Sequence, residues 1–180
     1  MELIRFDIEG LVLIKPRVFN DDRGYFFESF NADTFKKHNL ETDFIQDNES
    51  FSKRGSLRGL HFQNPPYGQG KLIRVVSGSV YDVAVDVRPD SKTYGKHLAV
   101  EITSTNKLML WIPPGFAHGF LTLEDNTVFL YKCTQFYNKE SESGIIWNDS
   151  DLAINWPDME KIVSEKDRQL SSFKQCVNKF

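Results

Sequence analysis

Hydrophobic and polar residues alternate over short stretches along most of the chain. Such alternation, bounded by Gly, Pro, Asn and Ser, is typical of β-strands that have one apolar and one polar face. In Ser79–Val87 one face carries Tyr81, Val83, Val85 and Val87, and the other carries Val80, Asp82, Ala84 and Asp86. The pattern predicts strands at Leu11–Ile14, Tyr25–Phe30, Phe44–Phe51, Leu57–Gln63, Lys71–Ser77, Ser79–Val87, His97–Thr103, Leu108–Ile112, His118–Leu123 and Thr127–Phe136.

Helical patterns are rare in this sequence. Asn31 is a favourable N-cap for a short helix over Ala32–His38, and we expect a second short helix in the polar tail Glu160–Phe180. Helices therefore do not alternate with the strands, which argues against a parallel α/β sheet. About ten strands with turns every ~8–12 residues predict an all-β sandwich or barrel. The length of 180 residues predicts a single domain over residues 1–180.

Composition and charge exclude several classes of function. The net charge is −3, whereas a dedicated nucleic-acid-binding protein is usually basic, so we expect no nucleic-acid partner. Met1–Gly10 contains four charged residues and no apolar run approaches the ~20 residues of a membrane span. Cys133 and Cys176 form no disulfide framework or zinc-type spacing, which favours two reduced thiols. Together these features predict a cytoplasmic protein with no membrane partner.

The segment from Arg58 to Gln63 has the highest density of chemically active residues. Strict alternation places His61 on one strand face with Gln63 and places Arg58 on the opposite face. A bulge near Gly59 is needed for Arg58 and His61 to share a pocket. The alternative is a surface arginine and a structural histidine at the end of a strand.

The segment Pro113–Phe120 is similar to the second signature of the cupin family, in which a Pro-x-Gly turn leads a histidine into a strand. The first cupin signature normally provides His-x-His, and then a Glu seven residues before a Gly. Here Gly78 fits that Gly, but Lys71 occupies the Glu position, and Phe62 and Gln63 follow His61. An ammonium group has no lone pair for a metal ion. The sequence thus resembles a cupin barrel with a cationic organic site and no metal site, in which Lys71 stabilises a developing enolate oxygen.

Seven blocks occur in an order that resembles the dTDP-4-dehydrorhamnose 3,5-epimerase family. They are Asp22–Glu28, Gln46–Ser50, Arg58–Gln63, Gln69–Val75, Pro113–Phe120, Tyr131–Lys132 and Lys166–Asp167. The similarity runs from about Leu11 to Arg168. It implies a cupin-like antiparallel jelly roll with short peripheral helices, which epimerises C3 and C5 of dTDP-4-dehydro-6-deoxy-D-glucose without a cofactor.

The resemblance also implies roles for individual residues. His61 would remove the protons next to the C4 ketone, Asp167 would support His61, Tyr131 would return the proton, and Lys71 would lie near the C4 oxygen. Tyr137 would stack on thymine. The other implied substrate-binding residues are Gln46, Asn48, Arg58, His118, Glu142 and Lys166. Arg23 and Glu28 would reach into the partner subunit's site, which implies a homodimer.

General chemistry is consistent with these roles. A neutral imidazole is a suitable base near pH 7, and a carboxylate partner fixes its tautomer. Tyr131 shares strand parity with Phe129 and Cys133, and also with Tyr137 if the strand remains regular that far. Asp82 and Asp86 share one face of their strand. Paired carboxylates occur at metal and glycosidase sites, but without a partner motif a polar cavity wall is the favoured interpretation.

Three alternatives remain open at this stage. The first is a mono-epimerase acting on a related dTDP-keto sugar, which would differ in the pocket wall and not in the acid–base residues. The second is a sugar-nucleotide-binding cupin without activity, which the full set of His61, Asp167 and Tyr131 disfavours. The third is a metal-dependent cupin isomerase or oxygenase, which Lys71 disfavours.

Overall fold

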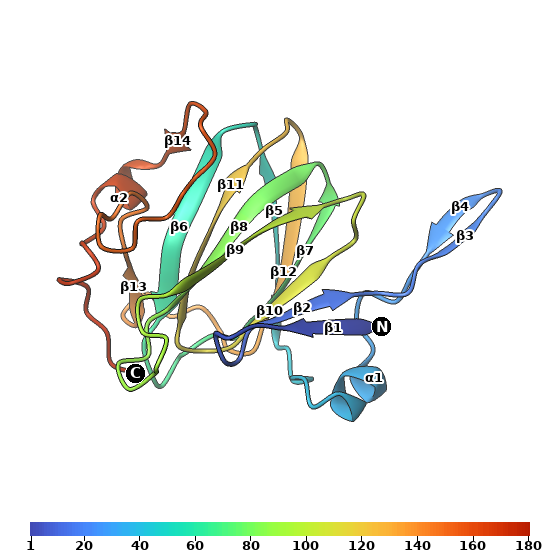
Figure 1. The fold of residues 1–180 in the computed structure, drawn as a ribbon, viewed down its shortest axis with the longest axis horizontal. Helices are drawn as coiled ribbons and strands as arrows, with labels where there is room; N and C mark the ends of the chain where they lie inside the picture. Colours follow the sequence, from blue (N-terminus) through green and yellow to red (C-terminus); the bar gives the residue numbers. More distant parts are fainter.

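Two antiparallel sheets face each other in a computed structural model that describes residues 1–180 (Figure 1). The first sheet has the order β1–β2–β10–β7–β12–β5, with β1 (Glu2–Arg5), β2 (Val12–Lys15), β5 (Gln46–Ser52), β7 (Lys71–Ser77), β10 (Met109–Ile112) and β12 (Thr127–Cys133). The second has the order β13–β6–β11–β8–β9, with β6 (Ser56–Gln63), β8 (Ser79–Asp86), β9 (His97–Thr103), β11 (Phe116–Thr122) and β13 (Glu142–Gly144). The short strand β14 (Ile162–Val163) pairs with β6 in parallel. The predicted all-β, cupin-like jelly roll is confirmed.

Three further elements lie outside the two sheets. The hairpin of β3 (Phe19–Asp21) and β4 (Gly24–Phe26) projects away from the barrel (Figure 1). Helix α1 (Ala32–Lys37) begins after the predicted cap, because the Asn31 side chain accepts a hydrogen bond from the backbone N–H of Thr34 at 3.1 Å. Helix α2 (Glu165–Arg168) is the short helix expected in the tail. Neither helix is long and apolar enough to cross a membrane.

Apolar side chains form three clusters, one between the sheets and one on each outer face. The interior cluster includes Ile73, Val75, Leu110 and the stacked pair Phe120–Phe129, whose ring centroids are 4.2 Å apart. The C-terminal segment covers the outer face of the second sheet, where Trp156 packs with Leu57 and Val83. Residues around α1 cover the outer face of the first sheet, where Phe35 packs with Ile14 and Met109. Because both outer faces are covered, the strands that line the interior are supported from behind.

Several predicted strand limits were wrong. The strand predicted at Tyr25–Phe30 ends at Phe26, and the strand predicted to reach Phe136 ends at Cys133. The strand predicted from Phe44 begins at Gln46, because Phe44 packs against Trp111 beside α1. The sequence analysis missed four short strands, β1, β3, β13 and β14. They have two to four residues each, too few for alternation to be recognised.

Candidate active site

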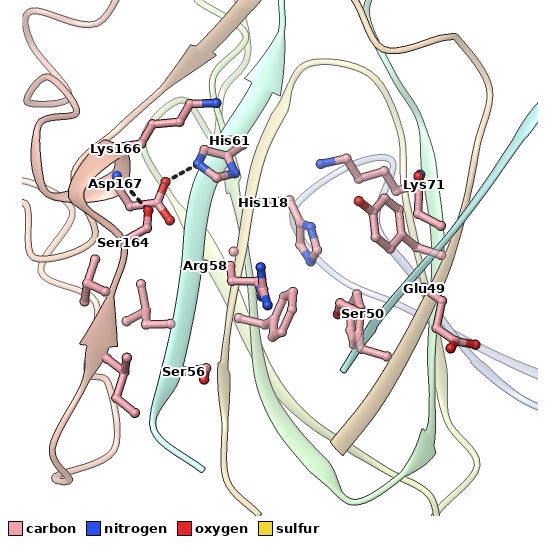
Figure 2. Close-up of a pocket in the computed structure, with 18 residues that line it drawn as sticks. Glu49, Ser50, Ser56, Arg58, His61, Lys71, His118, Ser164, Lys166 and Asp167 are labelled. Atoms are coloured by element: carbon pink, nitrogen blue, oxygen red, sulfur yellow. Dashed lines mark hydrogen bonds and ion pairs between the residues drawn. The ribbon is translucent and has the colours of Figure 1, made fainter. Parts of the chain in front are cut away.

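A cavity of about 590 Å³ lies between the β12–β5 side of the first sheet and the β6–β11 side of the second (Figure 2). Its polar lining comes mostly from side chains that the sequence analysis singled out. Of the predicted residues it contains Asn48, Arg58, His61, Lys71, His118, Tyr131, Lys166 and Asp167. One continuous space therefore joins residues from β5, β6, β7, β11, β12 and α2.

The predicted irregularity at Gly59 brings Arg58 and His61 into the same cavity. In the pairing of β6 with β11, His61 lies opposite His118, and Arg58 lies opposite Phe120. Between these two pairs β6 contains one residue more than β11, which is a β-bulge. Gly59 has φ +115°, and a Cβ there would come within 2.5 Å of Gly119 Cα and 2.6 Å of His118 O. Only glycine suits this position. The bulge overrides strict alternation and turns both side chains inward.

His61 and Asp167 form a close pair. The Nε2 atom of His61 lies 2.6 Å from Oδ1 of Asp167 (Figure 2). The Asp167 carboxyl is buried, which by itself raises its pKa. Hydrogen bonds from His61, Ser164 and the backbone of Gly59 more than offset this effect and hold the pKa of Asp167 below its ordinary value. An ionised Asp167 keeps the His61 proton on Nε2, which leaves the Nδ1 lone pair available as a base.

The position of Asp167 depends on the first turn of α2. Ser164 is the N-cap of this helix, and its hydroxyl accepts a hydrogen bond from the Asp167 backbone N–H at 3.1 Å. Sequence analysis did not single out Ser164, although the Ser-x-x-Asp spacing is a capping pattern that could have identified it. The cap fixes the carboxylate where His61 can reach it.

Lys71 and Tyr131 lie on neighbouring strands of the first sheet, opposite the strand that carries His61. Burial lowers the pKa of Lys71, and the nearby carboxylates of Asp82 and Glu142 oppose that shift. Burial raises the pKa of the Tyr131 phenol, so Tyr131 keeps its proton at neutral pH. The cavity thus presents a base on one sheet, and an acid and a cation on the other.

His118 lines the same cavity as Lys71 and Tyr131, and it pairs with a different carboxylate from the one that pairs with His61. Its Nε2 atom is 2.9 Å from Oδ2 of Asp82, a fully buried residue of β8. The favoured interpretation of Asp82 and Asp86 as a polar cavity wall was wrong, because neither residue lines the cavity. Asp82 supports a cavity residue, but Asp86 binds Arg88, Ser91 and Thr93 and does not line the cavity.

A second pocket of about 360 Å³ adjoins the cavity and shares Asn48, His61, Lys71 and Tyr131 with it. Its own predicted residues are Gln46, Tyr137 and Glu142. The expected strand parity of Tyr131 and Tyr137 does not apply, because β12 ends at Cys133. The loop that follows holds Tyr137 instead, through a backbone N–H bond to Gln46 Oε1 at 3.0 Å.

Glu142 connects the two pockets. Its carboxylate accepts a hydrogen bond from the Tyr137 hydroxyl at 2.9 Å and from the Lys166 ammonium at 2.7 Å. Lys166 lines the main cavity. The mouth of the site therefore has an exposed aromatic ring beside a lysine. This combination is suited to binding a nucleotide, because the ring can stack on the nucleobase and the lysine can bind a phosphate group.

Arg23 and Glu28 do not reach the cavity of their own chain. The Arg23 side chain is 91% exposed at the turn between β3 and β4, where it pairs with Asp21 at 2.6 Å. Glu28 accepts a hydrogen bond from Asn31 at 2.9 Å and does not line the cavity. Their predicted place in a partner's site stays a prediction.

The polar residues of the cavity do not form a metal site. No group of three His, Cys, Asp or Glu side chains is arranged to hold a metal ion. The two histidines each pair with a carboxylate, and a lysine lies beside them. The geometry suits proton transfer to and from a bound molecule that has an oxygen near Lys71.

Comparison with known proteins gives a consistent result. The family model described as dTDP-4-dehydrorhamnose 3,5-epimerase matches residues 5–175. The chain is 48% identical to the dTDP-4-dehydrorhamnose 3,5-epimerase of Escherichia coli, over 98% of this chain and 97% of that protein. It superposes on the same-named protein of Elizabethkingia anophelis with a TM-score of 0.92, at 46% identity and 97% coverage of each chain.

A further solved structure contains a bound sugar nucleotide. The dTDP-6-deoxy-D-glucose-3,5-epimerase of Legionella pneumophila, in complex with dTDP-4-keto-L-rhamnose, superposes with a TM-score of 0.93 at 42% identity, covering 97% of this chain and 93% of that one. The ordered motifs, the paired sheets and the cavity with His61, Asp167 and Tyr131 are thus accompanied by close similarity over nearly the full length. This chain belongs to the dTDP-4-dehydrorhamnose 3,5-epimerase family.

Proposed function

We propose that this protein epimerises C3 and C5 of dTDP-4-dehydro-6-deoxy-D-glucose to give dTDP-4-dehydro-L-rhamnose. The observation that carries this proposal is one cavity in which a histidine from one sheet, paired with a carboxylate, lies opposite a phenol from the other sheet. His61 and Asp167 supply the pair, and Tyr131 supplies the phenol. Inversion at carbon needs a base on one side of a ring and an acid on the other, which this arrangement provides.

The proposed reaction proceeds through an enolate at each carbon. C3 and C5 both lie next to the C4 ketone, so the Nδ1 lone pair of His61 takes a proton from either carbon and the electron pair moves onto the C4 oxygen. The Lys71 ammonium, desolvated in the cavity, stabilises that oxygen. Tyr131 then gives its proton to the opposite face of the carbon. Before the second carbon reacts, the His61 imidazolium releases its proton to water and the Tyr131 phenolate takes one from water, which restores the base and the acid. The ketone activates both carbons, so the reaction needs no cofactor.

The nucleotide is proposed to bind toward the mouth of the site. Arg58, which donates a hydrogen bond to Ser52 at 3.3 Å, and Lys166 supply positive charge for the two phosphates. Tyr137 is 54% exposed and offers a ring face for thymine. Gln46 and Asn48 are joined by a 3.1 Å hydrogen bond and face the sugar from β5.

We also propose that the protein acts as a homodimer in which Arg23 and Glu28 reach the partner's cavity. Three large side chains on the projecting hairpin, Phe19, Tyr25 and Phe26, are exposed in the single chain. Exposed aromatic residues on an extended arm are typical of a subunit interface. Mixing two inactive variants, Arg23→Ala and His61→Asn, tests this arrangement.

The mixing experiment has a definite expected yield. If Arg23 acts in the partner's site, a heterodimer contains one intact site and one doubly defective site. Half of randomly mixed dimers are heterodimers, so about a quarter of wild-type activity should return. If Arg23 acts within its own chain, every site in the mixture lacks one residue and no activity returns.

The chemistry is tested by proton NMR of the purified protein with dTDP-4-dehydro-6-deoxy-D-glucose in heavy water. Loss of the proton signals at both C3 and C5, with appearance of the L-rhamnose isomer, is expected. Exchange at one carbon only would show a mono-epimerase. Binding without exchange at either carbon would show a sugar-nucleotide-binding protein and overturn the proposal.

A further inference from the structure

Asp82 differs from the other buried aspartate on β8, Asp86. Both are fully buried, and their side chains lie on the same face of the strand. Asp86 accepts hydrogen bonds from Arg88, Ser91 and Thr93, so both of its oxygens have partners. Asp82 has one hydrogen bond, to His118, and its Oδ1 atom is buried with no partner. A buried carboxylate that serves only to stabilise the fold is normally fully hydrogen-bonded, so Asp82 needs another explanation.

The strand register explains how Asp82 reaches His118. In the pairing of β8 with β11, Asp82 lies opposite Phe120 and His118 lies opposite Ala84. Asp82 and His118 are thus diagonal neighbours on one face of the sheet, which long side chains can bridge. Aromatic packing fixes the plane of the imidazole, because His118 stacks on Phe129 with ring planes 19° apart. Stacking does not determine which ring nitrogen points toward the cavity or carries the proton.

We infer that Asp82 is a positioning residue that keeps the His118 proton on Nε2, so that Nδ1 serves as a hydrogen-bond acceptor for a hydroxyl group of the bound sugar. This inference rests on the proposed function and extends it to a residue behind the cavity wall. Asp82 does not line the cavity, whereas His118 does. The carboxylate can only accept, so Nε2 of His118 must donate.

The surroundings of His118 favour this neutral tautomer. Burial lowers the pKa of His118, Asp82 opposes that shift, and the nearby Lys71 and His61 reinforce it. With Nε2 protonated and the ring neutral, Nδ1 has a free lone pair. The Nδ1 atom of His118 makes no hydrogen bond within the chain, and it is not fully buried. It is therefore accessible from the cavity that His118 lines. Sugar hydroxyl groups are the donors that such an acceptor can hold.

The first test measures the tautomer directly. Long-range ¹H–¹⁵N NMR of the ¹⁵N-labelled wild-type protein distinguishes a protonated from an unprotonated ring nitrogen. The His118 signals are assigned by their absence from a His118→Gln sample. A proton on Nε2 and none on Nδ1 is expected. A proton on Nδ1, or on both nitrogens near pH 7, would overturn the inference without any variant of Asp82 and without any assay of epimerase activity.

The second test uses Asp82→Asn, with Asp86→Asn as the matched control. The amide introduced by Asp82→Asn can donate a hydrogen bond to Nε2 of His118, which would move the ring proton to Nδ1. Nδ1 would then be a hydrogen-bond donor and no longer an acceptor. We expect the tautomer to change and KM to rise, with a fall of about 5- to 150-fold in kcat/KM, the effect of one lost hydrogen bond to a buried partner. The Asp86→Asn variant should lower the melting temperature but leave KM and the His118 tautomer unchanged.

The outcomes separate this inference from the proposed function. If Asp82→Asn keeps wild-type KM while the wild type epimerises normally, the inference is wrong and the function stands. If Asp82→Asn only lowers the melting temperature, as Asp86→Asn does, the role of Asp82 is structural and the inference is again wrong. If the wild type exchanges no deuterium, the proposed function fails, and the NMR tautomer measurement still decides the role of Asp82.

Discussion

Nε2 of His61 lies 2.6 Å from Oδ1 of Asp167, a residue 106 positions later in the chain. The two come from different parts of the fold, since His61 is on a barrel strand and Asp167 is on a four-residue helix outside the barrel. Variants of this pair therefore report on how the fold positions the base and on what the base does in the reaction.

Replacing Asp167 by Asn should preserve binding and reduce turnover. The amide can donate to Nε2, so the His61 proton moves to Nδ1 and the base loses its lone pair. We expect kcat to fall by about 10²–10⁴-fold with KM changed little, measured by steady-state kinetics. Asp151→Asn, which removes a surface ion pair with Lys174, is the control and should leave kcat unchanged. Wild-type turnover in Asp167→Asn would show that the carboxylate does not orient the base.

His61 and Tyr131 should have separable effects. His61→Asn should abolish deuterium exchange at both C3 and C5, because no enolate forms. Tyr131→Phe should still exchange protons but with little inversion, since the enolate is reprotonated from its original face. NMR of exchange and inversion in one sample checks both. Rapid exchange in His61→Asn, or joint loss of exchange and inversion in Tyr131→Phe with normal binding, would contradict this division of roles.

Lys71→Ala should lower turnover more than binding. An enolate oxygen has more charge than a ketone oxygen, so the lysine acts mainly in the transition state. Loss of one such donor costs about 2.7–4 kcal/mol, or about 10²–10³-fold in kcat. Steady-state kinetics and a direct dTDP-binding measurement check this. A raised KM with normal kcat would place Lys71 on the nucleotide instead.

Turnover should also fall on the alkaline side because of Lys71. Burial holds the pKa of Lys71 below its ordinary value, so the amine loses its charge at a lower pH than an exposed lysine does. The rate should therefore decrease as pH rises, beginning below the ordinary lysine value of about 10.4. Burial raises the pKa of Tyr131, so the phenol does not account for this decrease. A pH–rate profile of kcat that stays flat up to the ordinary lysine value would contradict the assignment.

Activity should not depend on a metal ion. Lys71 occupies the position of a cupin metal ligand, and the cavity contains no group of three suitable ligands. Dialysis against a strong chelator should leave the rate unchanged. A rate that collapses and returns on addition of a divalent ion would contradict the organic-site mechanism.

Eight of the residues predicted from the sequence line one cavity, whereas several predicted strand limits were wrong. The bulge at Gly59 was a conditional prediction, needed only if Arg58 and His61, two residues of opposite parity, shared one pocket, as the structure shows that they do. The pairing of Asp82 with His118 could not, because it depends on the register of β8 against β11, which alternation within one strand does not specify. The position of Tyr137 was also out of reach, since a loop held by Gln46, and not strand parity, determines it.

The Ser164 cap and the segment around it have a consequence for the order in which the protein matures during synthesis. The last barrel strand of the first sheet, β12, ends at Cys133, well before Asp167 emerges from the ribosome. The same late segment supplies Trp156 and Phe173, which cover the outer face of the second sheet. A nascent chain can thus form its barrel strands while His61 still lacks its carboxylate and one apolar face is still uncovered. One late stretch of the chain, from Trp156 to Phe173, therefore supplies both the cover of that face and the carboxylate that pairs with His61, so protection of the fold and assembly of the catalytic pair depend on the same segment.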